Sequence, residues 1–147
     1  MQRSRETVVV DSSVAVKWYL RDEDMLSQAD RLFGEMRDGY IIAIAPYLAR
    51  YEVSRAITAA CRMGRHTWQQ GQADVRSFLE SGICLTADSD WLLLAAANLA
   101  LQTGVALYDA VYVGLADQLA ITYITADRRL YNAITSHYRF IRWLGDL

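Results

Sequence analysis

The sequence has little of several residue types that define common protein classes: one lysine, one proline, two cysteines and two histidines. Cys61 and Cys84 lie far apart and belong to no Cys/His spacing that would suggest a zinc site. The richest apolar stretch, Trp91 to Leu101, is too short for a membrane-spanning helix. The apolar run before Asp11 is too short for a secretion signal. We therefore expect a cytoplasmic protein with no membrane segment.

Positive charge is also scarce. The chain has 15 Lys and Arg against 17 Asp and Glu, a formal net charge of −2, so it does not bind nucleic acid by bulk charge. Lys17 is the only lysine, so nearly all cations are arginines. Arginine favours bidentate contact with phosphate, and a local basic rim around a binding site is therefore compatible with this composition. At 147 residues, 53% hydrophobic and 22% charged, the composition predicts one globular domain over residues 1–147.

Strand patterns alternate with one or two helix patterns along the whole chain. The run Val8-Val9-Val10 is typical of a strand buried on both faces. Alternation of this kind predicts a three-layer α/β/α fold with a central, mostly parallel sheet. Strands are expected near 7–10, 40–45, 83–87, 121–125 and 138–143, and helices near 14–20, 24–37, 47–63, 67–81, 90–102, 105–116 and 128–135.

Four acidic residues stand where a charge is costly. Asp11 and Asp127 end apolar strands, Asp109 interrupts an apolar helix, and Glu52 lies near the start of a helix that follows a strand. Parallel strands end at one edge of the sheet, where ligands bind, so the topology gathers these carboxylates. Clustered carboxylates repel one another unless a cation lies between them, and oxygen ligands suit Mg²⁺ or Mn²⁺. Singly, each residue could instead cap a helix or, for Glu52, pair with Arg55.

Hydroxyl side chains accompany two of these acids. Ser13 follows Asp11 by two positions, and Thr125 precedes Asp127 by two. A hydroxyl at this distance can hydrogen-bond a carboxylate or a metal-bound water and fix its orientation. Helix capping and strand propensity explain the same two residues equally well. The two histidines lie outside these motifs and are expected on the surface.

The ordered set of motifs resembles PIN-domain ribonucleases, and in size it is similar to VapC-type toxins of toxin–antitoxin pairs. The matching segments are VVDSSVAVKW (9–18), YEV (51–53), YDAVYVGLA (108–116) and ITADRRL (124–130). The resemblance implies a PIN-like fold. It implies an acidic cluster of Asp11, Glu52, Asp109 and Asp127 that binds Mg²⁺ or Mn²⁺, with Ser13 and Thr125 in support. Arg55 stands where the family often has asparagine; Arg55 and Lys17 are the candidates for contact with substrate.

The resemblance and the residues indicate a metal-dependent endoribonuclease, the toxin of a type II toxin–antitoxin system. Metal ions held by carboxylates activate a water molecule for attack on a phosphodiester, which leaves a 5′-phosphate and a 3′-hydroxyl. Two alternatives stay open: a catalytically silent PIN-like interaction module, and a metal-dependent phosphohydrolase of another α/β family. A receiver or haloacid-dehalogenase site would need a second acid close to Asp11, where the chain has Ser12 and Ser13.

Two kinds of protein partner are expected. The family resemblance implies an antitoxin that places a segment in the acidic groove. A surplus of aromatic residues in the early helices predicts a homodimer, because one small core does not easily absorb them. The residues that carry this expectation are Trp18, Tyr19, Tyr47 and Tyr51.

Overall fold

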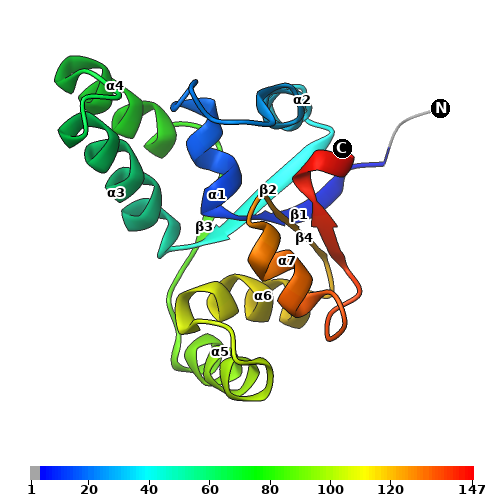
Figure 1. Ribbon diagram of the computed structural model, residues 1–147. Coiled ribbons are helices and arrows are strands. Elements are labelled where there is room, and N and C mark those ends of the chain that lie inside the picture. Colours follow the sequence, from blue (N-terminus) through cyan, green and yellow to red (C-terminus); the bar gives the residue numbers. More distant parts are fainter. Residues whose placement is uncertain (1–3) are drawn as a thin grey trace.

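Five parallel strands form one sheet at the centre of the molecule (Figure 1). The computed structural model describes residues 4–147. The strands lie in the order β3-β2-β1-β4-β5, and every neighbouring pair is parallel. Their bounds are β1 Glu6–Val10, β2 Ile41–Pro46, β3 Cys84–Thr86, β4 Thr122–Thr125 and β5 Ile141–Trp143. The predicted α/β class is confirmed, and the sheet is wholly parallel.

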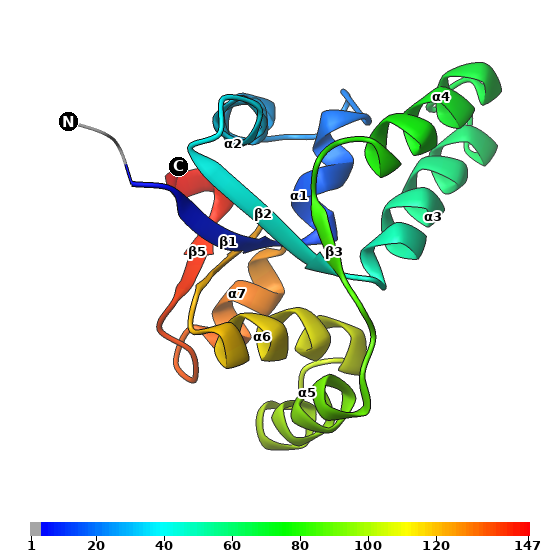
Figure 2. The same cartoon turned by 180° about the vertical axis from the view of Figure 1, so that it is seen from behind.

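Helices cover both faces of this sheet, which gives the predicted three-layer α/β/α arrangement. α1, α2 and the α3–α4 hairpin lie on one side, and α6 lies on the other with α5 packed against it (Figures 1 and 2). The helices are α1 Ser12–Ala15, α2 Leu26–Arg37, α3 Ala49–Arg62, α4 Trp68–Leu79, α5 Asp90–Thr103, α6 Leu107–Leu119 and α7 Arg128–Ile134, with 3₁₀ turns η1 Val16–Trp18 and η2 Leu144–Asp146.

The side chains of β1 alternate between two apolar clusters. Val8 and Val10 pack in the cluster that contains Leu32 of α2, whereas Val9 packs in the cluster that contains Val113 of α6. All three valines are almost completely buried, and full burial of a valine contributes about 1.5–3 kcal/mol. This double-sided burial holds β1 in the middle of the sheet and so fixes the position of the residue that follows it.

Two of the helix starts that differ from the expected ones lie beside the acids. The first helix was expected to start at Val14 but begins at Ser12, because Asp11 itself caps it. The helix expected from Val105 begins at Leu107, since Ala106 is still extended. Both shifts place an acid nearer to a helix N-terminus than the sequence pattern predicts.

Trp18 and Tyr19 do not form the exposed aromatic surplus expected from the sequence. Both are half-buried against the core, and the Trp18 indole donates a hydrogen bond to the Ala29 carbonyl at 2.9 Å. Tyr47 and Tyr51 are exposed, as expected, and further exposed apolar residues lie on α5 at Trp91, Leu94 and Leu101. No single helix within residues 4–147 is long and apolar enough to cross a membrane; α5 and α6 pass that test only as a pair, bent by 113°.

A buried polar contact ties the α3–α4 connection to α4. The ring of His66 is hydrogen-bonded to Asp74 at 2.5 Å, and Gln70 donates to the other oxygen of the same carboxylate at 2.8 Å. Asp74 is buried and His66 half-buried, whereas His137 is exposed. The expectation that both histidines lie on the surface is therefore wrong for His66, because the turn after α3 folds it back onto α4.

Candidate active site

The four predicted acids line a single cavity of about 1040 Å³ at the carboxyl edge of the sheet, here called the acidic cleft. Asp11 follows β1, and Asp127 follows β4 and caps α7. Glu52 and Asp109 lie in the first turns of α3 and α6, which enter the cleft from opposite sides of the sheet. The parallel topology thus brings together residues spread over most of the chain.

Asp11 forms the floor of the acidic cleft and is held by a dense set of donors. Tyr123 donates to Oδ1 at 2.9 Å, and Thr125 donates to Oδ2 at 3.2 Å. Ser13 donates to Oδ2 from its backbone at 3.3 Å and also from its hydroxyl. Only 5% of Asp11 is exposed, and burial raises the pKa of its carboxyl despite these donors. The geometry therefore fixes the direction of the carboxylate but leaves its charge poorly compensated.

Ser13 and Thr125 connect the two strand-end aspartates. The Ser13 hydroxyl accepts from the Ala126 backbone at 3.0 Å, and the Thr125 hydroxyl accepts from the Asp127 backbone at 3.0 Å. Asp127 in turn accepts from the backbone of Arg129 and Leu130, both through Oδ1. The helix-cap explanation for Asp11 and Asp127 is thus correct, yet it uses only part of each carboxylate.

Glu52 and Asp109 show the mutual repulsion expected of a crowded acidic site. Burial raises the pKa of Glu52, and the charges of Asp11 and Asp109 raise it further. The pKa of Asp109 is raised to about 6, first by burial and then by the charges of Asp11 and Asp127. The ionisation of Glu52 and of Asp109 is therefore coupled to the other acids of the cleft, which a set of unrelated helix caps would not show.

The donor set suits a hard divalent cation. Carboxylate oxygens are the ligands that Mg²⁺ and Mn²⁺ prefer. The raised pKa values of Asp11, Glu52 and Asp109 show that their ionised forms are costly in this cleft, chiefly because they are buried. Within residues 4–147, however, no three His, Cys, Asp or Glu side chains lie close enough together to hold a metal ion as they stand. A cation bound among the carboxylates would offset the repulsion between their ionised forms.

Arg55 and Lys17 lie in different surroundings. Arg55 lines the acidic cleft together with the carboxylates, and within the described part of the chain it forms no ion pair with Glu52. Lys17 does not line the cleft: it is 4% exposed, and its ammonium group lies 2.8 Å from Asp24. Lys17 is thus positioned to tie η1 to the loop before α2, not to contact substrate.

Two tyrosines that bind the acids were missed in the sequence. Tyr123 holds Asp11, and Tyr112 donates to Glu52 Oε1 at 2.7 Å. Burial raises the pKa of both phenols, so they remain donors at neutral pH. The sequence spacing could have indicated both. Tyr123 precedes Thr125 by two positions and so shares its face of the strand, and Tyr112 follows Asp109 by three positions and so lies on the same side of the helix.

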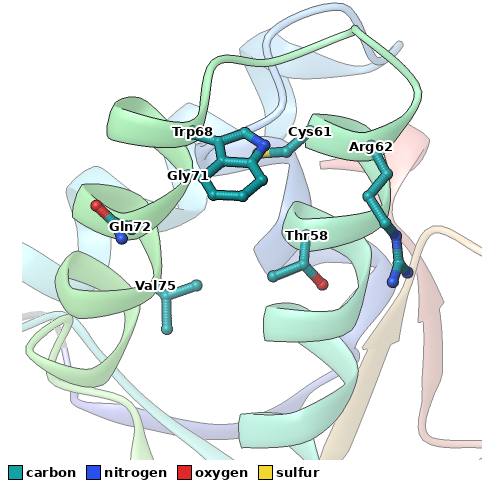
Figure 3. A pocket seen from close by; sticks show the side chains of 7 residues that line it. All are labelled: Thr58, Cys61, Arg62, Trp68, Gly71, Gln72 and Val75. Carbon is teal, nitrogen blue, oxygen red and sulfur yellow. The ribbon is translucent and has the colours of Figure 1, made fainter.

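A second cavity lies between α3 and α4, here called the hairpin groove. It has a volume of about 440 Å³, and Trp68 and Val75 of α4 face Thr58 and Cys61 of α3 across it (Figure 3). No carboxylate lines it, so it is no candidate for the chemistry. Thr58 also lines the acidic cleft, which makes the two cavities neighbours on the surface of α3.

Comparison with known families and structures agrees with this fold. The PIN domain family model matches residues 8–134, and the chain belongs to this family. No curated protein matches the chain by sequence.

Three solved structures illustrate the likeness. PAE2754 from Pyrobaculum aerophilum is 20% identical, with a TM-score of 0.67 over 99% of this chain and 90% of that one. VapC20 from Mycobacterium tuberculosis, described as a toxin that cleaves the sarcin-ricin loop, is 14% identical, with a TM-score of 0.64 over 86% and 94%. A toxin–antitoxin complex from Klebsiella pneumoniae is 13% identical, with a TM-score of 0.64 over 92% and 95%. At these identities, the likeness establishes the fold.

Proposed function

We propose that the protein is a metal-dependent endoribonuclease of the cytoplasm and the toxin of a toxin–antitoxin pair. The observation that carries the proposal is the acidic cleft, where Asp11, Glu52, Asp109 and Asp127 line one cavity in a PIN-domain chain. The description of VapC20 as a toxin that cleaves the sarcin-ricin loop supports RNA as the substrate class.

The four carboxylates would hold Mg²⁺ or Mn²⁺, which when bound supplies an activated water and neutralises charge on the phosphate. Asp11 contributes a carboxylate whose direction is set by Tyr123, Thr125 and Ser13 before any ligand arrives. Tyr112 fixes Glu52 in the same way from α6. Such preorganised partners are typical of residues around metal ligands, where they orient the ligand and tune its basicity.

Removal of divalent metal is expected to abolish RNA cleavage by the purified protein. With EDTA in excess, no cut RNA ends should appear, and added Mn²⁺ or Mg²⁺ should restore cleavage. The reason is that a bound cation lowers the pKa of a water molecule, which the carboxylates do not do by themselves. Sequencing the RNA ends should find 5′-phosphates and 3′-hydroxyls. Cleavage that continues unchanged in EDTA contradicts the metal-dependent proposal, and no cleavage under any condition favours a silent PIN-like module.

Arg55→Ala is expected to weaken RNA binding and leave the affinity for Mn²⁺ unchanged. Arg55 lines the acidic cleft without pairing to Glu52, so its guanidinium is available to a substrate phosphate. Loss of one phosphate contact should flatten the slope of log affinity against log salt by about 0.7 for single-stranded RNA. Arg62→Ala, on the same helix but on the hairpin groove, is the matched control. A weaker Mn²⁺ affinity with an unchanged salt slope would instead indicate that Arg55 positions Glu52 for metal binding.

We further propose a homodimer and an antitoxin that enters from the hairpin groove. An apolar segment in that groove would pass Thr58 and could place a basic side chain among the carboxylates. The exposed apolar residues of α5 provide the dimer surface. Light scattering should give twice the 16.6 kDa of one chain, and expression without a partner should arrest growth. A monomer that is harmless when expressed alone contradicts both parts.

A further inference from the structure

Two exposed tyrosines stand at the mouth of the acidic cleft, each directly before one of its carboxylates. Tyr51 precedes Glu52 in the first turn of α3, and Tyr108 precedes Asp109 in the first turn of α6. The two residues are 68% and 63% exposed. Two helices from opposite faces of the sheet therefore present the same pair, an aromatic ring beside an acid, to one cavity.

The space between these rings continues beyond the carboxylates. Tyr51, Tyr108 and Leu48 line the acidic cleft and also a neighbouring cavity of about 250 Å³. The remaining walls of that smaller cavity are mostly apolar, with Pro46 at the end of β2 and Leu92 from α5. A mostly apolar, partly aromatic compartment, which also contains Asp88, thus opens directly onto the acids.

The faces of these two rings are available to a ligand. Most other tyrosines contact a second aromatic ring or an arginine: Tyr19, Tyr47, Tyr112, Tyr123, Tyr131 and Tyr138. Across residues 4–147, neither Tyr51 nor Tyr108 has such a contact or a hydrogen bond from its phenol. The chain therefore leaves its unstacked tyrosines at the acidic cleft.

We propose that Tyr51 and Tyr108 stack on an unpaired base beside the phosphate to be cut. This inference rests on the proposed function and deepens it. Aromatic rings bind any base through its π face, but the bases of a duplex have their faces covered by their neighbours. Arg55, one helical turn beyond Tyr51, lines the same cleft and supplies the cation that a phosphate needs.

The test measures binding of a short RNA with 2-aminopurine at successive positions, whose fluorescence falls when the base is stacked. The protein carries Asp11→Asn so that RNA is not consumed, and the buffer contains Mn²⁺. Tyr51→Leu and Tyr108→Leu remove the ring but keep an apolar side chain, and the matching Phe variants keep the ring and remove the hydroxyl. Tyr40→Leu, at the opposite end of β2, is the control, and melting temperatures verify folding.

Each Leu variant is expected to lower affinity for the single strand roughly 5- to 100-fold and to reduce quenching at one or two adjacent positions. The Phe and Tyr40→Leu variants should behave as the parent protein does. The same RNA in a duplex should bind weakly and be insensitive to all of these changes.

Unchanged affinity and quenching in both Leu variants overturn the proposal, as does an equal loss for single strand and duplex. It is also overturned if these variants bind RNA normally but release a protein partner, since the rings would then form a protein-binding surface. Cleavage by the protein with Asp11 intact is scored separately. If the protein cleaves RNA but RNA binding does not depend on the two tyrosines, only this inference is wrong. If RNA binding depends on the tyrosines but no cleavage occurs, only the proposed function is wrong.

Discussion

Asp11→Asn is expected to lower the rate of RNA cleavage at least about 100-fold and to leave the protein folded. Substitution of a residue that hydrogen-bonds to a metal ligand typically lowers activity 10- to 100-fold. Substitution of the ligand itself should therefore lower activity by at least the upper value. Asparagine keeps the size of the side chain and an oxygen that can accept from the Ser13 backbone. Because burial raises the pKa of Asp11, its ionised form is costly at pH 7, and the neutral amide should maintain or raise the metal-free melting temperature.

Asp74→Asn is the matched control for this experiment. Asp74 is as buried as Asp11 but is bonded to His66 and Gln70, away from the acidic cleft. Its substitution should lower stability by about 1–3 kcal/mol and leave the cleavage rate unchanged. If Asp11→Asn instead unfolds the protein, as expected of a purely structural helix cap, Asp11 loses its assignment as a metal ligand.

Acidification below pH 6 is expected to weaken Mn²⁺ binding by about tenfold per pH unit for each proton that the metal displaces. The reason is Asp109, whose pKa of about 6 keeps its carboxyl protonated in acid, and a metal requires the ionised form. Calorimetric titrations between pH 5 and 7, in buffers of different ionisation enthalpy, should count the protons released. An affinity for Mn²⁺ that is independent of pH over this range contradicts the prediction.

The same shift gives the metal-free protein an inverse dependence of stability on pH. The pKa of Asp109 is higher in the folded state than its ordinary value of 3.8, so the folded state binds the additional proton between pH 3.8 and about 6. The contribution of Asp109 to the free energy of unfolding is therefore greatest in acid and is lost as the pH rises through 6. Saturating Mn²⁺ should reverse this trend, because it stabilises the ionised form.

The strands and the four acids could be predicted because short-range patterns encode them. Three adjacent valines define β1, and an acid after an apolar strand is conspicuous at Asp11 and again at Asp127. Their convergence follows from one rule, that parallel strands end at the same edge. Local pattern and topology together were thus sufficient for the outline of the site.

The contacts that shape each acid could not be predicted, since they join residues far apart in sequence. Tyr112 reaches Glu52 across 60 positions, and nothing near either residue specifies the other. Lys17 stands in a motif beside the acids, yet the 3₁₀ turn at η1 directs it to Asp24. Trp18 and Tyr19 looked like surface aromatics, because their burial depends on α2 and α4, which pack on them later in the chain.

The order of the strands also determines when the site comes into existence during translation. β1 lies beside β4, and the hydrogen bond from Thr125 to Asp11 spans 114 positions. The first acid therefore leaves the ribosome long before the strand that must lie next to it, and Asp127 follows later still. It follows that a nascent or prematurely ended chain has no complete acidic cleft. Synthesis of the last fifth of the polypeptide, which contains β4 and Asp127, is therefore the step that completes the acidic cleft.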